Sequence, residues 1–146
     1  MTDYPDKTGR DDRRVEPVLD RLVDSAPTAM AHLSVDGRGL RFNDRWTAVT
    51  GQATDEALGA GWESMVDPDG RQEFLADLAQ SLSAGTPLRG RLRLVAAAST
   101  TRWVDLSTVP LSGSDGMPDG ALMNLTDISD EMDEARRARE LTRVLE

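Results

Sequence analysis

The most constraining feature of this sequence is a predicted strand that continues into a predicted helix without a break. Residues 121–129 are largely apolar, and residues 130–146 repeat apolar side chains at three- and four-residue spacing behind a charged face. No glycine or proline separates them, and Asp127 or Ser129 is suited to cap the helix. Acidic residues come first in the helix and arginines follow, as its dipole favours. A strand coupled to an outgoing helix is suited to pass conformational change onward.

Length and charge narrow the class of protein. The 146 residues suffice for one domain with a real core, and a net charge of −9 argues against nucleic acid or an anionic membrane as the main partner. No apolar run reaches the length of a membrane span, and no signal peptide is recognisable. With no cysteine and a single histidine, disulfides and a zinc site of the usual kind are excluded. We expect a cytoplasmic domain.

The beginning of the chain shows two segments. Residues 1–14 lack periodicity and are predicted to be disordered. Residues 15–26 are predicted to form an N-terminal flanking helix that ends at Pro27, because apolar side chains follow helical spacing there. This stripe either docks on the domain's own sheet or pairs with its copy in a dimer. Its apolar residues are Val15, Val18, Leu19, Leu22, Val23 and Ala26, and the first four are the candidate dimer contacts.

The remaining elements predict an α+β domain over residues 27–129. A hairpin with an Asp36-Gly37 turn comes first, and Asn43 is placed to cap a short helix over residues 44–50 that stops at Gly51. Thr54 is expected to cap another helical turn, and a longer helix runs from Arg71 to the Gly85 region. Three strands follow. This order implies a five-stranded antiparallel sheet with helices on one face.

Short motifs in this order resemble the PAS domain family over roughly residues 22–129. They are Ala26-Pro27, Asp36-Gly37, Phe42-Asn43, Thr50-Gly51, residues 56–59 and Asp67-Pro68-Asp69, followed by a PAC-type C-terminal region with residues 91–94, Arg102-Trp103-Val104 and residues 125–129. The resemblance implies a sensory role, in which a ligand or partner perturbs the sheet and flanking helices carry the signal onward. Two places differ from the family pattern. Asp67-Pro68-Asp69-Gly70 stands where His-Pro-Asp-Asp is frequent, and residues 96–99 stand where an Asp-Gly turn is usual.

Catalytic and cofactor chemistry finds little support, and the chain is predicted not to be an enzyme. His32 is the only imidazole and sits inside a predicted strand, so a structural role is favoured over pH sensing or ligand contact. Haem-binding members of the family generally take their histidine from the long helix, where residues 71–84 have none. Photoactive flavin members need a cysteine, which this chain lacks. Any cofactor is therefore left unknown.

A pocket, if present, is expected between the inner face of the sheet and the helices. There it could hold a small-molecule ligand, although many members of the family have packed, empty interiors. The three tryptophans are otherwise core residues, since each buries a large area. The candidate lining residues are Trp46, Leu58, Trp62, Met65, Phe74, Leu78, Leu92 and Met123.

The last helix is the element most relevant to the predicted function. Its spaced apolar residues predict a C-terminal signalling helix over residues 130–146 that pairs in a short coiled coil, and hence a homodimer; the alternative is a helix folded back on its own domain. Thr126, Asp127 and Ile128 form the expected signal junction. The function predicted is relay to a downstream effector such as a kinase, a cyclic-dinucleotide enzyme, a phosphatase or a further PAS domain. The alternative is a ligand-free protein-interaction domain. The seam residues singled out are Met132, Ala135, Leu141 and Leu145.

Overall fold

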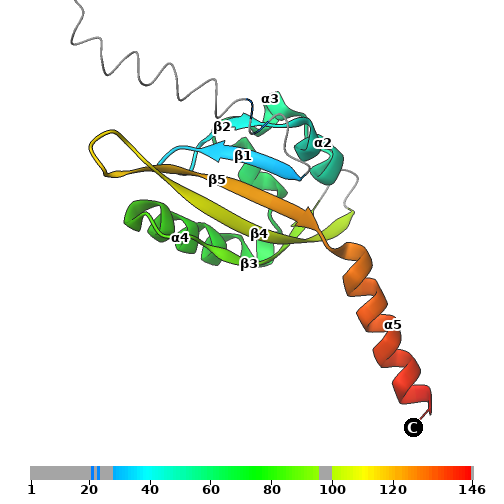
Figure 1. Cartoon of the computed structure of the whole chain (residues 1–146). Coiled ribbons are helices and arrows are strands. Elements are labelled where there is room, and N and C mark those ends of the chain that lie inside the picture. The colour runs from blue at the N-terminus through cyan, green and yellow to red at the C-terminus, as the bar shows by residue number, and fades with distance from the viewer. Residues whose placement is uncertain (1–20, 22, 24–27, 96–99, 146) are drawn as a thin grey trace, which may run out of the picture.

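The computed structural model describes residues 21, 23, 28–95 and 100–145 (Figure 1). Arg21 and Val23 are helical, and Val23 is fully buried. The predicted disordered segment 1–14 lies outside the described residues. So do four apolar residues of the predicted flanking helix, Val15, Val18, Leu19 and Leu22.

The described residues form one antiparallel sheet in the strand order β2-β1-β5-β4-β3. β5 lies in the middle of the sheet, and β3 and β2 form its edges (Figure 1). Hairpins join β1 to β2 and β4 to β5, because short turns connect antiparallel neighbours. The predicted five-stranded antiparallel sheet is confirmed. The strands are β1 Ala29–Leu33, β2 Gly39–Phe42, β3 Arg89–Val95, β4 Thr101–Ser112 and β5 Pro118–Asp127.

Helical elements fill the connection between β2 and β3, and one helix follows β5. The connection holds α2 (Asp44–Thr50), α3 (Thr54–Ala57), the 3₁₀ helix η1 (Gly61–Met65) and α4 (Pro68–Ala84). The last helix is α5, Ser129–Leu145. Figure 1 shows α5 leaving the end of β5 and projecting away from the body of the domain.

Local sequence signals account for the ends of α2. Asn43 Oδ1 accepts a hydrogen bond from Trp46 N at 3.2 Å, so the predicted N-cap is confirmed. Gly51 ends the helix with φ +77°, a left-handed conformation that glycine adopts without steric cost.

Two predicted helix starts were wrong. Thr54 is the first residue inside α3 rather than its cap, and the cap position belongs to Ala53, whose backbone N–H donates to Glu56 Oε1 at 3.2 Å. The long helix α4 begins at Pro68 rather than Arg71. Proline suits the first turn of a helix, where its missing N–H would have no intrahelical partner, and Asp67 caps it by accepting from Asp69 N.

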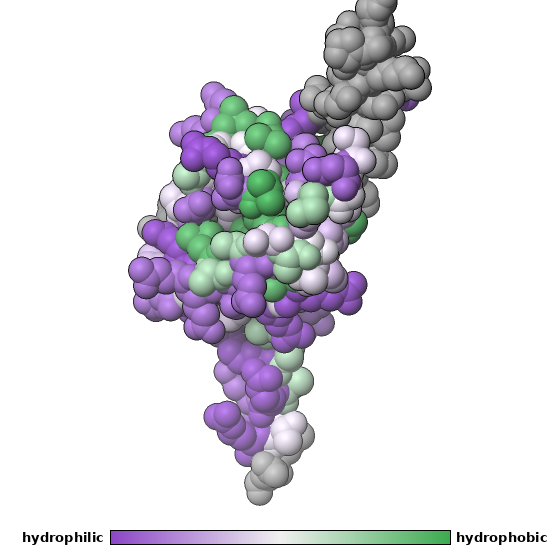
Figure 2. All heavy atoms as spheres, turned by 90° about the vertical axis from the view of Figure 1, so that its left-hand side faces the viewer, coloured by the Kyte–Doolittle hydropathy of each residue, from purple (hydrophilic) through white to green (hydrophobic). Residues whose placement is uncertain are grey.

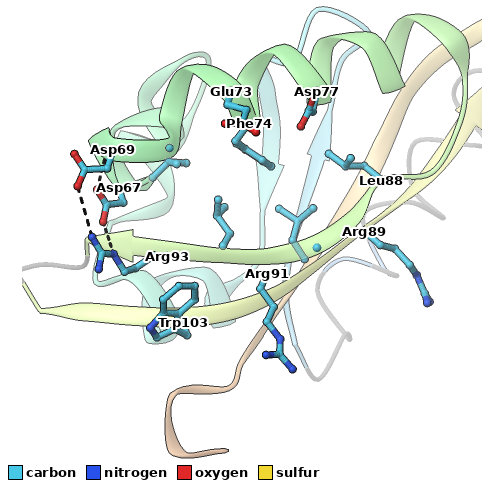
Figure 3. A pocket seen from close by; sticks show the side chains of 15 residues that line it. Asp67, Asp69, Glu73, Phe74, Asp77, Leu88, Arg89, Arg91, Arg93 and Trp103 are labelled. Atoms are coloured by element: carbon cyan, nitrogen blue, oxygen red, sulfur yellow. Dashed lines mark hydrogen bonds and ion pairs between the residues drawn. The ribbon is translucent and has the colours of Figure 1, made fainter. Parts of the chain in front are cut away.

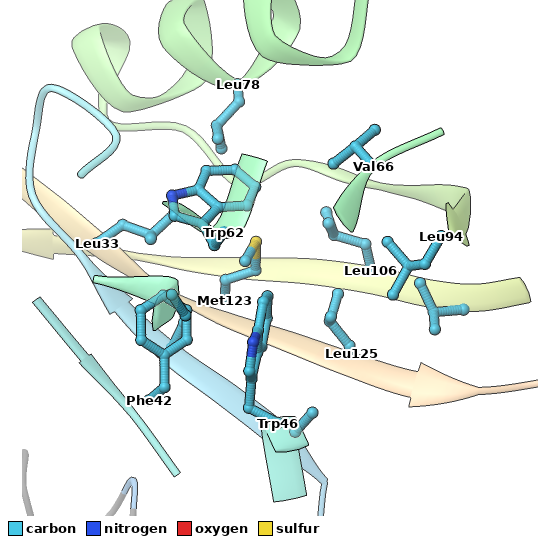
Figure 4. Packing of buried hydrophobic residues seen from close by; sticks show 14 of the residues in the cluster. Leu33, Phe42, Trp46, Trp62, Val66, Leu78, Leu94, Leu106, Met123 and Leu125 are labelled. Atoms are coloured by element: carbon cyan, nitrogen blue, oxygen red, sulfur yellow. The ribbon is translucent and has the colours of Figure 1, made fainter. Parts of the chain in front are cut away.

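The core lies between the sheet and the helical connection. Every second residue of β1 is fully buried, namely Ala29, Ala31 and Leu33, so one face of the sheet packs against the helices. Trp46 from α2 and Trp62 from η1 lie over this face with only 1% and 2% of their surfaces exposed (Figure 4). Each buried indole also has a hydrogen-bond acceptor. Trp46 Nε1 donates to Gln52 Oε1, and Trp62 Nε1 donates to Gly37 O, both at 3.1 Å.

Candidate functional site

Five of the eight candidate pocket residues meet in the interior, but they enclose very little space. Together with four aliphatic neighbours they surround a void of about 10 Å³ between the sheet and η1 (Figure 4). Such a volume accommodates about one water molecule at most. This part of the predicted pocket is therefore filled by its own side chains. The five residues are Trp46, Trp62, Met65, Leu92 and Met123.

The other three candidates lie elsewhere. Leu78 is a core residue with 1% exposure, and Phe74 is half-buried with its ring 6.3 Å from that of Trp62, edge to face. Leu58 is 49% exposed and does not reach the interior. It follows the last residue of α3, and the preceding Ala57 is the fully buried side chain of this turn.

A larger groove lies on the outside of the domain, between α4 and β3 (Figure 3). Its volume is about 410 Å³. Phe74 and Leu92, both predicted pocket residues, line it together with Leu88 and Leu106. Its rims differ in charge, because α4 contributes carboxylates and β3 contributes guanidinium groups. The charged lining residues are Asp67, Asp69, Glu73 and Asp77 on one side and Arg89, Arg91 and Arg93 on the other.

One end of this groove is closed by an ion pair. The Arg93 guanidinium binds the Asp67 carboxylate directly, and Arg93 Nη2 lies 3.9 Å from Asp69 Oδ2 (Figure 3). Asp67 also accepts a hydrogen bond from Asp69 N at 2.9 Å. The Asp69 N–H and the Arg93 guanidinium hold the pKa of Asp67 below its ordinary value of 3.8. Asp67 is thus an anion that joins the start of α4 to the edge of the sheet.

Trp103 lies at the same end of the groove and also holds the start of α5. In the sheet it pairs with Arg93, and its side chain contributes to the groove lining. Its backbone makes two further bonds across the sheet. Ile128 N donates to Trp103 O at 2.8 Å, and Trp103 N donates to Ser129 Oγ at 3.0 Å. A displacement of Trp103 would therefore act directly on the first residues of the outgoing helix.

Asp127 fixes the other side of this junction. Its Oδ1 accepts from Ser129 N at 2.9 Å, and its Oδ2 accepts from Arg102 Nη1 at 2.8 Å. Burial alone would raise the pKa of Asp127, but the hydrogen bonds from Ser129 and Arg102 outweigh it and hold the pKa below 3.8. A carboxylate at this position also favours the positive end of the α5 dipole.

The three junction residues have different environments. Thr126 is exposed, whereas Asp127 and Ile128 are half-buried. Ile128 O accepts from Met132 N at 3.0 Å, so Ile128 already takes part in the first turn of the helix. The junction residues that sequence reasoning missed are Arg102 and Trp103. Their only local signal was the Arg-Trp-Val motif, which gives no indication of their partners across the sheet.

The seam residues of α5 lie on a helix that projects from the domain. Ala135 and Leu141 are exposed, Leu141 by 65%, and Met132 is half-buried. The side chain of Leu145 is outside the described part of the chain. Figure 2 shows α5 below the body of the domain as a mostly hydrophilic helix with a short apolar strip.

Among the described residues, no group of three or more His, Cys, Asp or Glu side chains is arranged to hold a metal ion. Within the same part of the chain, no helix is long and apolar enough to cross a membrane. His32 is half-buried, and it alternates along β1 with Ala31 and Leu33, which places it on the sheet face opposite the helices.

Known structures share this fold at low sequence identity. A PAS domain from Colwellia psychrerythraea is 16% identical, with a TM-score of 0.68 over 80% of this chain and 98% of that one. The PAS domain of Bordetella pertussis BvgS is 23% identical, with a TM-score of 0.67 over 90% and 98%. The N-terminal domain of a diguanylate cyclase with PAS/PAC sensor from Marinobacter aquaeolei is 11% identical, with a TM-score of 0.66 over 72% and 98%.

Sequence comparison gives the family. The protein y4lL of Sinorhizobium fredii, described as uncharacterized, is 38% identical over 80 residues. These make up 55% of this chain but only 10% of that much longer protein. The family model described as the PAS fold matches residues 23–133, from the helical Val23 through the sheet and the junction into α5. The chain therefore belongs to the PAS fold family.

Proposed function

We propose that this chain is a sensory and dimerisation module of a cytoplasmic signalling protein. A ligand or partner bound in the groove between α4 and β3 perturbs the sheet, and α5 relays the change to a downstream effector domain. Membership of the PAS family supports this role. One structural relative carries the description of a diguanylate cyclase with PAS/PAC sensor, which supports an effector of the cyclic-dinucleotide type.

The observation that carries the proposal is the double role of Trp103. Its side chain lines the groove, and its backbone N–H and C=O both bond to the first residues of α5. Trp103 thus joins the groove to the start of α5. Such coupling requires a structural element with two arrangements, whose equilibrium is shifted by binding in the groove and by the state of the effector. The crossing or register of two paired α5 helices is that element in our proposal.

Dimerisation through α5 is supported by its shape and exposure. The helix projects from the domain, and its apolar residues Ala135 and Leu141 are exposed (Figure 2). Most of the stability of a helix in a protein comes from packing of its apolar face, so packing against another helix would stabilise α5. We therefore propose a parallel pair of α5 helices. The N-terminal helical stripe remains a second predicted contact in the dimer.

Spin labelling tests whether the junction sets the direction of α5. The chain has no cysteine, so Glu63→Cys in η1 and Arg139→Cys in α5 give two unique labelling positions. With both positions labelled in a minority of chains diluted with unlabelled protein, electron–electron resonance reports the distance within one chain. We expect a narrow distribution, and a broad one after Asp127→Ala. The matched control Asp130→Ala removes an exposed carboxylate of the same helix turn. Equally narrow distributions in all three proteins would contradict the relay.

A second candidate function is a ligand-free interaction domain. The filled interior favours it, because the void there holds about one water molecule at most. Native mass spectrometry separates the two functions. Extra mass that is lost on denaturation would identify a bound small molecule and a chemical sensor, whereas a bare dimer would favour relay or interaction through the flanking helices. A bare monomer would contradict dimerisation.

A further inference from the structure

The outer edge of β3 is only partly paired within the described residues. β3 is an edge strand, and at one end Val66 forms a bridge with Leu94 while Asp67 N donates to Arg93 O at 3.0 Å. Successive residues of a strand direct their backbone groups to opposite edges. No bridge continues past Leu94 towards the start of the strand, so the outer edge stays open there.

The unpaired backbone groups of this edge are those of two arginines. Arg91 and Arg89 lie two and four residues before Arg93, so their backbone N–H and C=O groups point outward as those of Arg93 do. Their side chains share one face with Arg93, since side chains of a strand alternate between faces. The edge therefore offers two more backbone positions of the kind that Asp67 already occupies. At the first of them, the exposed Arg91 guanidinium also lies 3.7 Å from the exposed Asp105 carboxylate of β4, which a peptide carboxylate would join or replace.

Asp67 shows what such a position binds. It sits opposite Arg93 and contacts that residue twice, with its backbone N–H on the Arg93 carbonyl and its carboxylate on the Arg93 guanidinium. Pairing then stops, because the next residue, Pro68, begins α4. The chain itself thus supplies one residue of an additional strand and then turns away.

From this arrangement we infer that the β3 edge binds an extended acidic peptide of a partner protein, which adds to the sheet antiparallel to β3. Main-chain bonds to Arg91 and Arg89 would supply affinity, and carboxylates at alternate positions would pair with the two guanidinium groups. The inference concerns the groove that we propose as the input site, but it does not require that α5 respond to binding.

The groove leaves room for this strand. It runs beside β3 from Arg89 to Arg93 and has a volume of about 410 Å³. At Gly90 a Cβ atom would meet no other atom within 4 Å, so the strand face beside α4 is open there. The peptide's intervening side chains would point to this face, where Phe74 and Leu92 provide apolar contacts.

The opposite wall restricts the sequence of the peptide. Glu73 and Asp77 from α4 line the groove and have no ion pair among the described residues. Acidic side chains on that face would be repelled, whereas apolar or basic ones would be accepted. The ligand is therefore a peptide in which acidic residues alternate with apolar or basic ones, and a run of consecutive acidic residues fits less well.

Titration of the full 146-residue chain with synthetic peptides tests the inference. The probe is the capped, fluorescein-labelled peptide Asp-Val-Asp-Val-Asp, and the control probe replaces each Asp by Lys. We expect fluorescence polarisation to show saturable binding of the acidic probe at concentrations below about 1 mM, with the basic probe at least about tenfold weaker. In hydrogen exchange, the amides of Arg91 and Arg89 should become protected when the acidic probe binds.

Three variants separate the contributions of charge and backbone. Arg89→Glu with Arg91→Glu should weaken the acidic probe by at least about tenfold. Arg45→Glu with Arg38→Glu makes the same charge change on exposed residues outside the groove lining and should leave binding within about twofold. Arg91→Pro removes an outward N–H, which an edge strand tolerates, together with the Arg91 guanidinium, and should also abolish protection of the edge.

Several results would overturn the inference. Equal affinity for the two probes, or no binding, would contradict peptide recognition. The arginines would then serve to prevent the exposed edge from pairing with other sheets. Unchanged binding by Arg91→Pro would exclude strand addition. A dimer of the free chain that Arg91→Pro dissociates would assign the edge to a second copy instead. Because none of these measurements depends on the orientation of α5, failure here is distinguishable from failure of the proposed relay.

Discussion

Arg102 and Asp127 are joined across neighbouring strands at the point where the sheet gives way to α5. Arg102 Nη1 lies 2.8 Å from Asp127 Oδ2, while Oδ1 of the same carboxylate accepts from Ser129 N at 2.9 Å. One carboxylate therefore links β4 to the first residue of the helix. The backbone of Trp103, next to Arg102, completes the junction through Ile128 and Ser129.

Removal of the Asp127 side chain should loosen the junction without unfolding the domain. Asp127→Ala deletes two charge-assisted hydrogen bonds, but the side chains of Arg102 and Asp127 are 38% and 28% exposed, so water partly replaces them. We expect a loss of about 1 kcal/mol in the free energy of unfolding, measured by urea denaturation. Asp130→Ala should change it by less than about 0.5 kcal/mol. A loss as small for Asp127→Ala would show that the carboxylate does not hold the junction.

Stability should fall as the pH drops towards and below 3.8, because of two carboxylates. The pKa values of Asp67 and Asp127 are lower in the folded chain than the ordinary 3.8, so the unfolded chain takes up these protons first as the pH falls. Their stabilisation is complete above 3.8 and is lost as the pH falls through the lower folded values. Urea denaturation between about pH 6 and pH 3 measures this slope.

Neutral variants identify the source of that slope. Asp67→Asn combined with Asp127→Asn should reduce the dependence of the free energy of unfolding on pH in acid solution. Asp44→Asn combined with Asp130→Asn changes the net charge equally at exposed positions and should retain the slope. An identical slope in all proteins would mean that other groups govern acid unfolding.

Asn43 should be the most sensitive polar residue of the domain's first half. Its Oδ1 accepts from Met30 N at 3.0 Å and from Trp46 N, and its Nδ2 donates to the carbonyls of Val23 and Thr28, both at 2.9 Å. Asn43→Ala leaves these buried groups without partners, so we expect a loss of about 3 kcal/mol in the free energy of unfolding. Chemical denaturation measures it, with the exposed neighbour variant Asp44→Ala as the control. Equal, small losses would contradict the role of Asn43 as a tie between α2 and the start of the domain.

Two glycines should respond oppositely to an added methyl group. A Cβ at Gly61 would overlap the Glu56 carbonyl oxygen, whereas a Cβ at Gly90 would meet nothing within 4 Å. We therefore expect Gly61→Ala to lower the free energy of unfolding by about 3 kcal/mol and Gly90→Ala to leave it unchanged or slightly raised. Thermal and urea denaturation compare the two. Comparable destabilisation by Gly90→Ala would show that the groove beside β3 is narrower than described.

Leu141 should contribute to the proposed helix pair. It is 65% exposed in the single chain, and its burial in a dimer would stabilise association by about 1.5–3 kcal/mol per side chain. Leu141→Gln should raise the dimer dissociation constant by at least about tenfold in sedimentation equilibrium. Arg143→Gln lies two residues on, nearly on the opposite side of a helix with about 3.6 residues per turn, and should leave the constant within about twofold. A dimer unaffected by Leu141→Gln would place the interface elsewhere.

Elements set by neighbouring residues were predictable from the sequence. The cap at Asn43, the stops at Gly51 and Gly85 and the direct passage from β5 to α5 all follow from side chains within a few positions of each boundary. The misplaced starts of α3 and α4 have the same cause. At Ala53 a backbone N–H bonded to a glutamate took the place expected for a threonine cap, and Asp67 with Pro68 started α4 one turn earlier.

The candidate site was likewise predictable only in part. The capping position at the strand–helix boundary predicted Asp127 as a junction residue. The apolar spacing of the long helix and of the strand after it predicted Phe74 and Leu92 as pocket residues. It did not predict that Leu58 stays at the surface or that the interior closes to about 10 Å³. Those outcomes depend on how side chains from different helices and strands pack against one another in the core.

The sequence by itself determined the order of the elements, because periodicity, caps and turns act over short stretches of chain. Its ordered motifs carried the resemblance to the PAS family, which the family model confirms. Only the tertiary structure decided which groups meet. Arg102 with Asp127 and Arg93 with Asp67 lie 25 and 26 residues apart, and each pair forms only when the strand register brings its members together. The groove likewise exists only because α4 packs on the middle of the sheet and leaves the first part of β3 uncovered, which depends on contacts between elements far apart in the sequence.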